Sequence, residues 1–484
     1  MRKISVLALS SLVLLSSCNF SALFENDDDY QKLTDVTNLF FVNPTKTDKE
    51  TKDKWITIKK SNSRSIIEDE VPSTLPETGT VEHTAPYLFD NSLLFREDNS
   101  RTTDTTTTVR VRKFKLGEKH GFYDADYMNG NRTGTLKYEG EYCYIWTLDD
   151  EDEDSLMSAE EIEEFAEKFD HYYEQETAIC GPKYDGITSY TNIIQPNKKI
   201  SILLFDIQND KWNGNLLGYF HPAYYANDQS GKNQIELLCI DSFYAKDEDY
   251  ASGLYSTVVH EFNHMLNFAN KTLKYGLEMD TWYTEMLSML TEDLFDDQLG
   301  TDFDNSIYSR LKIFVQGGYV FGFGNWADIL QNDFRVSFNY SNAYAFGAFL
   351  VRNYGGAELF HEIATNAYVN EESVVEAVNT LNKTNKTFEQ LLKEFCLVLI
   401  NPKAEDSSKP SLYIEVSRNI DGYEFTLPKI DLEEIAEIAE TTITPIEAGS
   451  NISKYLDSYG FHYYQFEEED LKVKFKDFLL CFYN

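Results

Sequence analysis

The stretch that decides the fold is VVHEFNHMLNF, residues 258–268, where two histidines stand four residues apart and a glutamate follows the first. On an α-helix, residues four apart lie on one face, so His260 and His264 can point at one ion. Neutral imidazole is a good ligand for zinc. Burying two histidines and a glutamate on so apolar a helix would be costly without a metal. The stretch therefore predicts a helix that carries a zinc site.

The glutamate of this stretch suits a different task from the histidines. Glu261 is rotated by about 100° around the helix axis from His260, which places it beside the ligands and not on the metal. From there it can take a proton from an attacking water and return it to the leaving amine. The pattern thus predicts peptide-bond hydrolysis by a zinc-activated water, with Glu261 as general base. The alternative is a pair of core histidines with ordinary partners, for which Asp241 is a candidate.

A zinc site of this kind needs a third protein ligand. The metzincin pattern requires glycine and histidine where this chain has Asn267 and Asn270, which excludes that class. Carboxylates that follow the histidine helix are the other source, and four compete: Glu278, Asp280, Glu285 and Glu292.

The position of each carboxylate distinguishes the four. Asp280 or Thr281 is placed to cap the next helix, and Glu278 falls in the connecting loop, a less rigid platform. Glu285 and Glu292 lie about 10 Å apart along the axis of that helix, so they are not expected to bind one ion together. Glu285 fits best by its distance from His264 (285 − 264 = 21 residues). Glu292 and Asp293 are candidates for supporting contacts.

These residues also carry a family resemblance. HEFNHMLNF (260–268) followed by TWYTEMLSMLTED (281–293) resembles the hyicolysin family of bacterial zinc metallopeptidases, and ISILLFDI, GYFHP, IELLCIDS and YAFGAFLVRNYGG fit the same pattern. The resemblance covers residues 142–364. It implies a secreted endopeptidase of gluzincin type with one zinc ion per chain. It further implies that His260, His264 and Glu285 are the zinc ligands and that Glu261 is catalytic.

The first residues, MRKISVLALSSLVLLSSC, predict export. Two basic residues precede an apolar run from Ile4 to Leu15, which is typical of a secretory signal over residues 1–17. Leu15-Ser16-Ser17-Cys18 resembles the lipobox of bacterial lipoproteins, so Cys18 is the expected lipidated residue. The alternative is a plain secretory signal. We therefore expect an exported bacterial lipoprotein, anchored to the membrane by lipid only, at the cell surface or facing the periplasm.

The composition limits the class of partner that the protein can bind. The net charge of −38 repels nucleic acid, so the expected partner is a protein or peptide substrate. A content of 42% hydrophobic residues indicates a globular protein with a large core. Five cysteines besides Cys18 leave room for one or two disulfides.

The organisation predicted along the chain has five segments. After the signal come a polar tether (18–84), a β-rich segment (85–148), a zinc metallopeptidase domain (149–404) and a β-rich segment (405–484). Within the peptidase domain, Ser158 and Glu161 form a capping box that predicts a helix start.

The expected fold class is α+β: a thermolysin-like zincin domain with a mixed sheet and a helical lobe, flanked by β-rich segments. We expect a substrate to extend along a sheet edge, with IELLCIDS (235–242) as the candidate strand. Tyr340 and Tyr344 are candidates for stabilising an oxyanion, and His221 for lining a substrate cleft; the alternative for all three is an ordinary core or surface role. The rival hypothesis for the whole protein is a surface binding or adhesion lipoprotein on an inactive peptidase scaffold.

Overall fold

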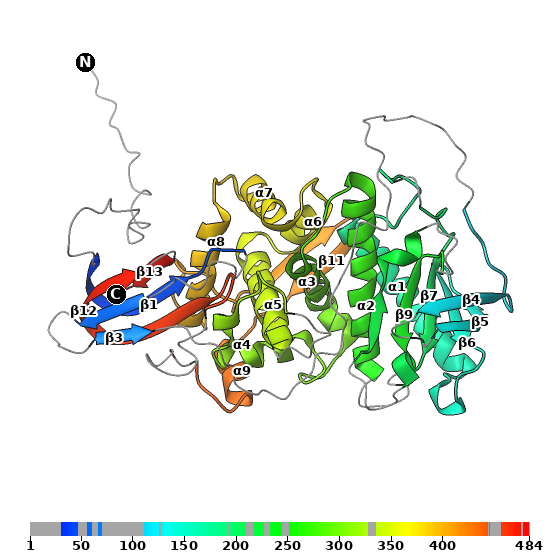
Figure 1. Cartoon of the computed structure of the whole chain (residues 1–484), viewed down its shortest axis with the longest axis horizontal. Helices are drawn as coiled ribbons and strands as arrows, with labels where there is room; N and C mark the ends of the chain where they lie inside the picture. The colour runs from blue at the N-terminus through cyan, green and yellow to red at the C-terminus, as the bar shows by residue number, and fades with distance from the viewer. Residues whose placement is uncertain are drawn as a thin grey trace, which may run out of the picture.

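Three parts follow one another along the long axis of the protein (Figure 1). The structure is a computed structural model that describes residues 31–46, 56–60, 66–69, 111–124, 128, 130–190, 193–209, 216–226, 233–243, 251–327, 335–443, 445, 456–475 and 478–483. A six-stranded sheet with two long helices lies at one end, a helical lobe in the middle, and a second sheet at the other end. The expected signal (1–17) and Cys18 lie outside the described residues. The α+β class is confirmed.

The larger sheet has the strand order β4-β5-β6-β7-β9-β8. Its strands are β4 (Lys119–Asp124), β5 (Gly130–Glu139), β6 (Cys143–Leu148), β7 (Ile200–Phe205), β8 (Gly218–Phe220) and β9 (Leu237–Asp241). The sheet is mixed, because β6, β7 and β9 run parallel while the other pairs are antiparallel. Along β7, Ile202 and Leu204 face the main core, whereas Leu203 and Phe205 face a second apolar cluster. Both faces of the central strands are therefore covered, which explains their unbroken apolar sequences.

This sheet corrects two expectations. The IELLCIDS strand is β9, and it lies between β7 and β8 rather than at an edge. The outermost strand on this side is β8, a three-residue strand within the GYFHP stretch, where the sequence did not predict a strand. The expected boundary at residue 148 is also wrong as a break between domains, because β6 continues into the same sheet through its parallel pairing with β7.

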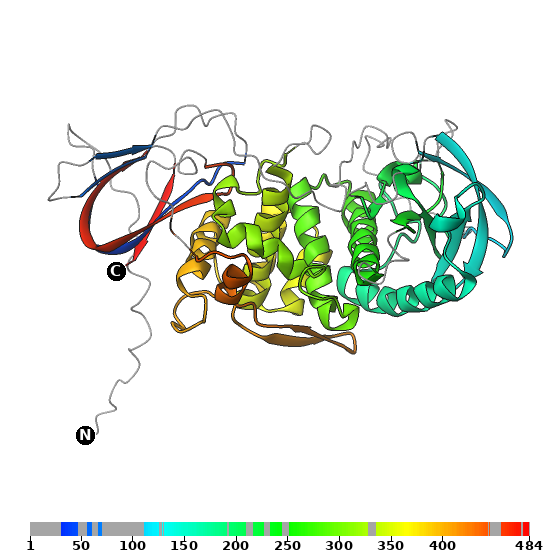
Figure 2. The ribbon, with the colours of Figure 1, turned by 90° about the horizontal axis from the view of Figure 1, so that it is seen from below.

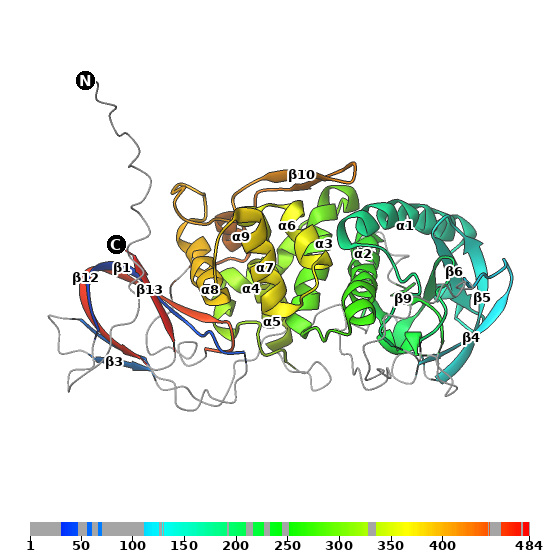
Figure 3. The ribbon, with the colours of Figure 1, turned by 90° about the horizontal axis from the view of Figure 1, so that it is seen from above.

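Helices α1 (Ala159–Cys180) and α2 (Ala251–Asn267) pack beside each other on one face of the larger sheet, as Figure 3 shows for α1. The predicted capping box is present at the start of α1, where the Ser158 side chain accepts a hydrogen bond from the Glu161 amide and the Glu161 side chain accepts one from the Ser158 amide. Helix α2 carries the histidines and continues into a π-helical turn, η8 (Phe268–Leu273). It therefore stands between the sheet and the helical lobe.

The helical lobe follows α2. It contains α3 (Thr281–Leu299), α4 (Leu311–Val315), α5 (Arg335–Tyr354), α6 (Ala357–Thr365), α7 (Asn370–Asn382), α8 (Phe388–Phe395) and α9 (Leu432–Ile438). The hairpin of β10 (Val416–Ile420) and β11 (Tyr423–Leu427) lies along its outside (Figure 3). Short 3₁₀ turns lie at Glu153–Ser155, Ile207–Asn209, Pro222–Tyr225, Ile307–Arg310, Gly318–Phe321 and Cys396–Ile400. Among the described residues, no helix is both long and apolar enough to cross a membrane.

Both ends of the described chain build the second sheet. Its order is β13-β1-β12-β2-β3, and it is strongly curved (Figure 2). The strands are β1 (Gln31–Val42), β2 (Ile56–Lys60), β3 (Ile66–Asp69), β12 (Phe461–Phe475) and β13 (Leu479–Tyr483). The expected polar tether is therefore wrong for these parts of residues 18–84. Alternate apolar side chains of β1 enter two clusters, so burial outweighs the polar composition of the surrounding sequence.

A buried ion pair joins α3 to α5. Arg352 donates two hydrogen bonds to Asp293, at 2.7 and 2.9 Å, and its Nε donates to the Pro428 carbonyl. The Tyr308 hydroxyl donates to the same carboxylate at 3.0 Å. The pair thus connects the helix that follows the histidine helix to the rest of the lobe.

Arg352→Met is expected to lower the free energy of unfolding by about 3–5 kcal/mol, because it leaves the Asp293 carboxylate buried without its cation. Urea unfolding followed by circular dichroism measures the loss. The double variant Arg352→Met/Asp293→Leu is the control and should recover most of the stability, since it removes both charges. A loss below about 1 kcal/mol in the single variant would contradict this account.

The cysteines remain as thiols. Cys143, Cys180, Cys239, Cys396 and Cys481 are all free and buried. The one or two disulfides that the sequence allowed are therefore not formed among the described residues.

Candidate metal centre

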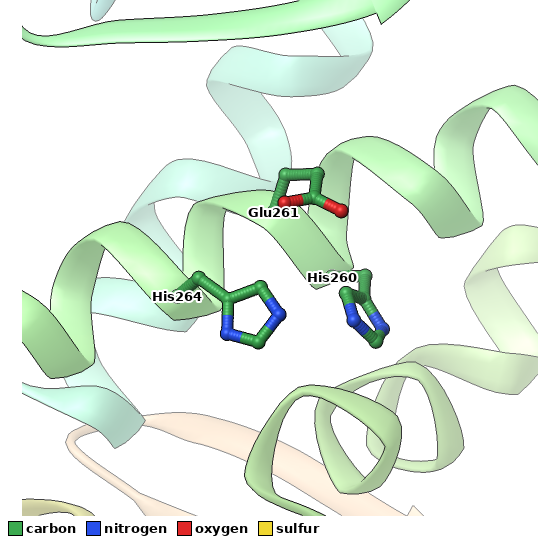
Figure 4. Close-up of side chains that lie close together, drawn as sticks. All are labelled: His260, Glu261 and His264. Carbon is green, nitrogen blue, oxygen red and sulfur yellow. The ribbon is translucent and has the colours of Figure 1, made fainter. Parts of the chain in front are cut away.

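The two histidines project from one side of α2, and Glu261 projects from another (Figure 4). Ligand atoms of His260, Glu261 and His264 all lie within 4.8 Å of one another, and all three residues are buried. Facing them from α3 is Glu285, whose Oε2 lies 3.2 Å from His260 Nε2 and whose Oε1 lies 3.6 Å from His264 Nε2. The structure therefore brings together all four residues that the sequence pointed to.

The spacing of these donors fits a tetrahedral ion. Bonds of about 2.0–2.2 Å at tetrahedral angles put neighbouring ligand atoms about 3.3–3.6 Å apart. The two distances from the Glu285 carboxylate to the histidine nitrogens, 3.2 and 3.6 Å, match that separation. Two imidazoles and one carboxylate are also a common donor set for catalytic zinc. The residues present thus fit a zinc ion in both chemistry and spacing.

Each histidine is held through its other ring nitrogen. His260 Nδ1 lies 2.7 Å from the Glu292 carboxylate, which also accepts a hydrogen bond from Ser256. His264 Nδ1 lies 2.9 Å from the Thr284 hydroxyl and 3.1 Å from the Ser288 hydroxyl. These contacts orient the rings so that both Nε2 atoms face Glu285. Such outer contacts set the tautomer and raise the basicity of ligating histidines.

Glu292→Gln is expected to weaken metal binding by about 10–100-fold, because it keeps the shape of the side chain but removes the charge that supports His260. Competition with a chromophoric chelator measures the affinity. Asp297→Asn, an exposed change on the same helix, is the control and should bind the metal as the wild type does. Equal affinity in Glu292→Gln and the control would show that Glu292 does not support the site.

Glu261 has a fixed orientation of its own. Its Oε2 accepts a hydrogen bond of 2.8 Å from the Phe220 amide, at the end of β8. Its Oε1 has no hydrogen-bond partner among the described residues. Burial raises the pKa of Glu261, and the positive charges of His264 and His260 act in the opposite direction. One oxygen is therefore held by the sheet, while the other is available for proton transfer.

The charges of the site favour a cation at the histidines. Burial alone would lower the pKa of His260, but the hydrogen bonds and negative charges of Glu285 and Glu292 raise it. Burial alone would raise the pKa of Glu285, but the two histidines lower it. The site thus stabilises positive charge next to a carboxylate, as a metal centre requires.

The competing carboxylates have other roles. Glu278 is exposed in the loop before α3. Asp280 occupies the N-cap position of α3, but its side chain makes no capping hydrogen bond and pairs instead with Lys46 at 2.5 Å. Of the two candidates for supporting contacts, Glu292 lies beside His260, whereas Asp293 binds Arg352. Asp241 accepts hydrogen bonds from the Ile207 and Phe243 amides, so it is not the partner of the histidine pair.

The three remaining candidates, Tyr340, Tyr344 and His221, have contacts with residues outside the candidate metal centre. Tyr344 lies by the Asp293–Arg352 pair, and Tyr340 packs against Trp326 and Arg310. His221 Nδ1 accepts a hydrogen bond from the Ala223 amide at the start of a 3₁₀ turn. These contacts place Tyr340 in packing and His221 in capping, while the Tyr344 hydroxyl has no hydrogen-bond partner among the described residues.

Four contacts of the site lie beyond the prediction from sequence. Three are made by hydroxyl groups: Thr284 and Ser288 contact His264, and Ser256 contacts Glu292. The Phe220 amide could not be found from side-chain patterns, because a backbone group carries no signal in the sequence. Its place next to Glu261 follows only from the packing of β8 against α2.

Comparisons with known proteins show which family the chain belongs to. A family model described as Peptidase M30 matches residues 131–461. The chain is also 23% identical over 333 residues to the neutral metalloprotease ShpI of Staphylococcus hyicus. The aligned region covers 66% of this chain and 67% of that protein. With the histidine helix, these findings define the class: the chain is a metallopeptidase. It belongs to the peptidase M30 family, and the expected resemblance is confirmed.

Proposed function

We propose that this metallopeptidase is an exported zinc endopeptidase whose ligands are His260, His264 and Glu285. The observation that carries the proposal is the carboxylate of Glu285, which faces the Nε2 atoms of both histidines at 3.2 and 3.6 Å. These three residues would hold the ion, which would supply Lewis acidity toward a peptide carbonyl and toward water near neutral pH. The proton transfers that hydrolysis also requires would be carried out by Glu261 of α2.

In this proposal Glu261 moves the proton. Its Oε1 accepts a proton from the attacking water and passes it to the amine that leaves. The Phe220 amide holds Oε2, so the carboxylate does not rotate away between the two transfers. Burial raises the pKa of Glu261, which improves its fit to a task that requires both gain and loss of a proton.

The same amide connects the proton shuttle to the sheet. Because β8 is the outermost strand on this side and ends beside Glu261, we propose that an extended peptide lies along β8. This replaces β9, which is buried between two strands. The substrate is a protein or peptide segment in extended form.

Metal analysis and hydrolysis of casein by the purified chain test the zinc proposal. We expect one zinc per chain, loss of cleavage with a chelator, and recovery when zinc is restored. Cleavage that persists after complete removal of metal would contradict the proposal. Tight protein binding without cleavage by the zinc-loaded chain would favour the adhesion hypothesis.

We also propose that the chain is anchored through Cys18, on the strength of the apolar run and the Leu15-Ser16-Ser17-Cys18 motif. Cys18→Ala should release the protein from the membrane fraction or leave its signal uncleaved. Labelling with a lipid precursor, followed by fractionation, measures this. Ser16→Ala, which keeps the cysteine, is the control. A Cys18→Ala variant that is still labelled would rule out the anchor.

A further inference from the structure

Helix α1 buries a carboxyl group that has no hydrogen-bond partner among the described residues. The side chain of Glu176 is fully buried, and neither of its oxygens makes a hydrogen bond among the described residues. Burial raises the pKa of Glu176 well above its ordinary value. Buried carboxyl groups in native proteins are nearly always hydrogen-bonded or paired, so an exception needs a reason.

Two other buried acids among the described residues have full sets of partners. Glu236 pairs with Lys183 at 3.1 Å and accepts a hydrogen bond from the Asn197 amide. Asp293 is bound by Arg352. Glu176 therefore differs from Glu236 and Asp293, because it is buried without a hydrogen bond to any described residue.

The neighbours of Glu176 place it behind the metal centre. One turn earlier on α1, Tyr172 contacts Tyr255 of α2 and Phe295 of α3. One turn later, Cys180 accepts a hydrogen bond of 3.2 Å from Asn263 of α2. Residues four apart share a helix face, so Glu176 faces the junction of α1, α2 and α3.

That junction contains the supporting contacts of His260. Glu292 of α3 and Ser256 of α2 meet there, and Glu292 holds the His260 ring. Glu176 and His260 share no hydrogen bond, so a charge at the metal centre would act on this carboxyl group through space. A divalent cation at the histidines would therefore stabilise the negative charge of this carboxyl group. Electrostatic interactions are strong in the protein interior, so no direct contact is needed.

We propose that Glu176 is a positioning residue of the metal centre, which strengthens cation binding at His260 and His264 from the α1 side and is kept despite its cost to the stability of the metal-free fold. This inference rests on the proposed zinc site. It assigns α1, which contributes no ligand, a part in metal affinity.

Two substitutions of Glu176 test the inference through metal affinity and metal-free stability. Glu176→Met removes both buried oxygens, so the metal-free chain should melt a few degrees higher. Glu176→Gln keeps the shape without the charge and should melt close to the wild type. In both variants, zinc affinity measured by chelator competition should fall by about tenfold or more. A role in packing alone would change melting but not affinity.

Gln175→Met is the matched control, since Gln175 is the buried neighbour on α1 that bonds to Gln298 on α3. It should melt lower and bind zinc normally. Zinc affinity within about twofold of wild type in both Glu176 variants would overturn the inference. If Glu176→Met does not fold, Glu176→Gln decides.

The wild type and His264→Ala separate this inference from the proposed function. One zinc per wild-type chain, lost in His264→Ala, supports the metal centre whatever the Glu176 variants do. A wild type that binds no zinc would overturn the metal centre and the inference together.

Discussion

Glu261→Gln is expected to keep its zinc and to lose about 10²–10⁴-fold in the rate of peptide hydrolysis, the range that general acid–base catalysis contributes. The amide cannot take up the proton, but it is the same size as the carboxylate. It can also still accept the hydrogen bond from the Phe220 amide. The fold and the metal ligands should therefore be unaffected. Single-turnover hydrolysis of a fluorogenic peptide, with metal content measured on the same sample, tests this.

The control for Glu261→Gln is Glu278→Gln, the same change at an exposed position in the loop before α3. It should retain wild-type hydrolysis. Near-normal hydrolysis by Glu261→Gln would remove this residue from the mechanism, while loss of zinc would show that it acts on metal binding instead.

Glu285→Ala is expected to reduce zinc affinity by more than about 100-fold and to abolish hydrolysis, because loss of an outer contact alone costs about 10–100-fold. The carboxylate faces both histidine nitrogens, so its removal leaves two ligands and takes away the negative charge that stabilises the cation. Equilibrium dialysis against buffered zinc measures the change. The metal-free chain should remain folded.

Glu278→Ala is the matched control for Glu285→Ala and should bind zinc normally. The result that would contradict the ligand assignment is full zinc occupancy in Glu285→Ala together with its loss in Glu292→Ala. In that case the peptidase class would stand, and only the third ligand would change.

The position of Glu285 depends on contacts far from the histidines. Trp282, three residues earlier on α3, packs against Phe323 and Tyr459, the latter just before β12. Lys46, just after β1, pairs with Asp280 at the start of α3. The second sheet thus helps to hold the start of the helix that presents the carboxylate. Such support is what a precise ligand geometry needs.

The sequence alone determined those features that lie within one helix. The four-residue spacing of His260 and His264 and the rotation of Glu261 between them both follow from 3.6 residues per turn. They reappear in the structure as predicted. The capping box at Ser158 is local for the same reason. Short-range geometry leaves few alternatives, so pattern reasoning succeeds there.

Only the tertiary structure decided which segments meet. Strand β1 pairs with β12 across more than four hundred residues of sequence, in a region that reads as a polar tether. Strand β8, and not β9, is outermost, and it brings the Phe220 amide to Glu261. Glu176 reads as an ordinary helical glutamate until α1 is placed against α2 and α3. The physical reason is that strand partners and helix contacts depend on burying apolar surface between distant segments, and many pairings satisfy the same local pattern.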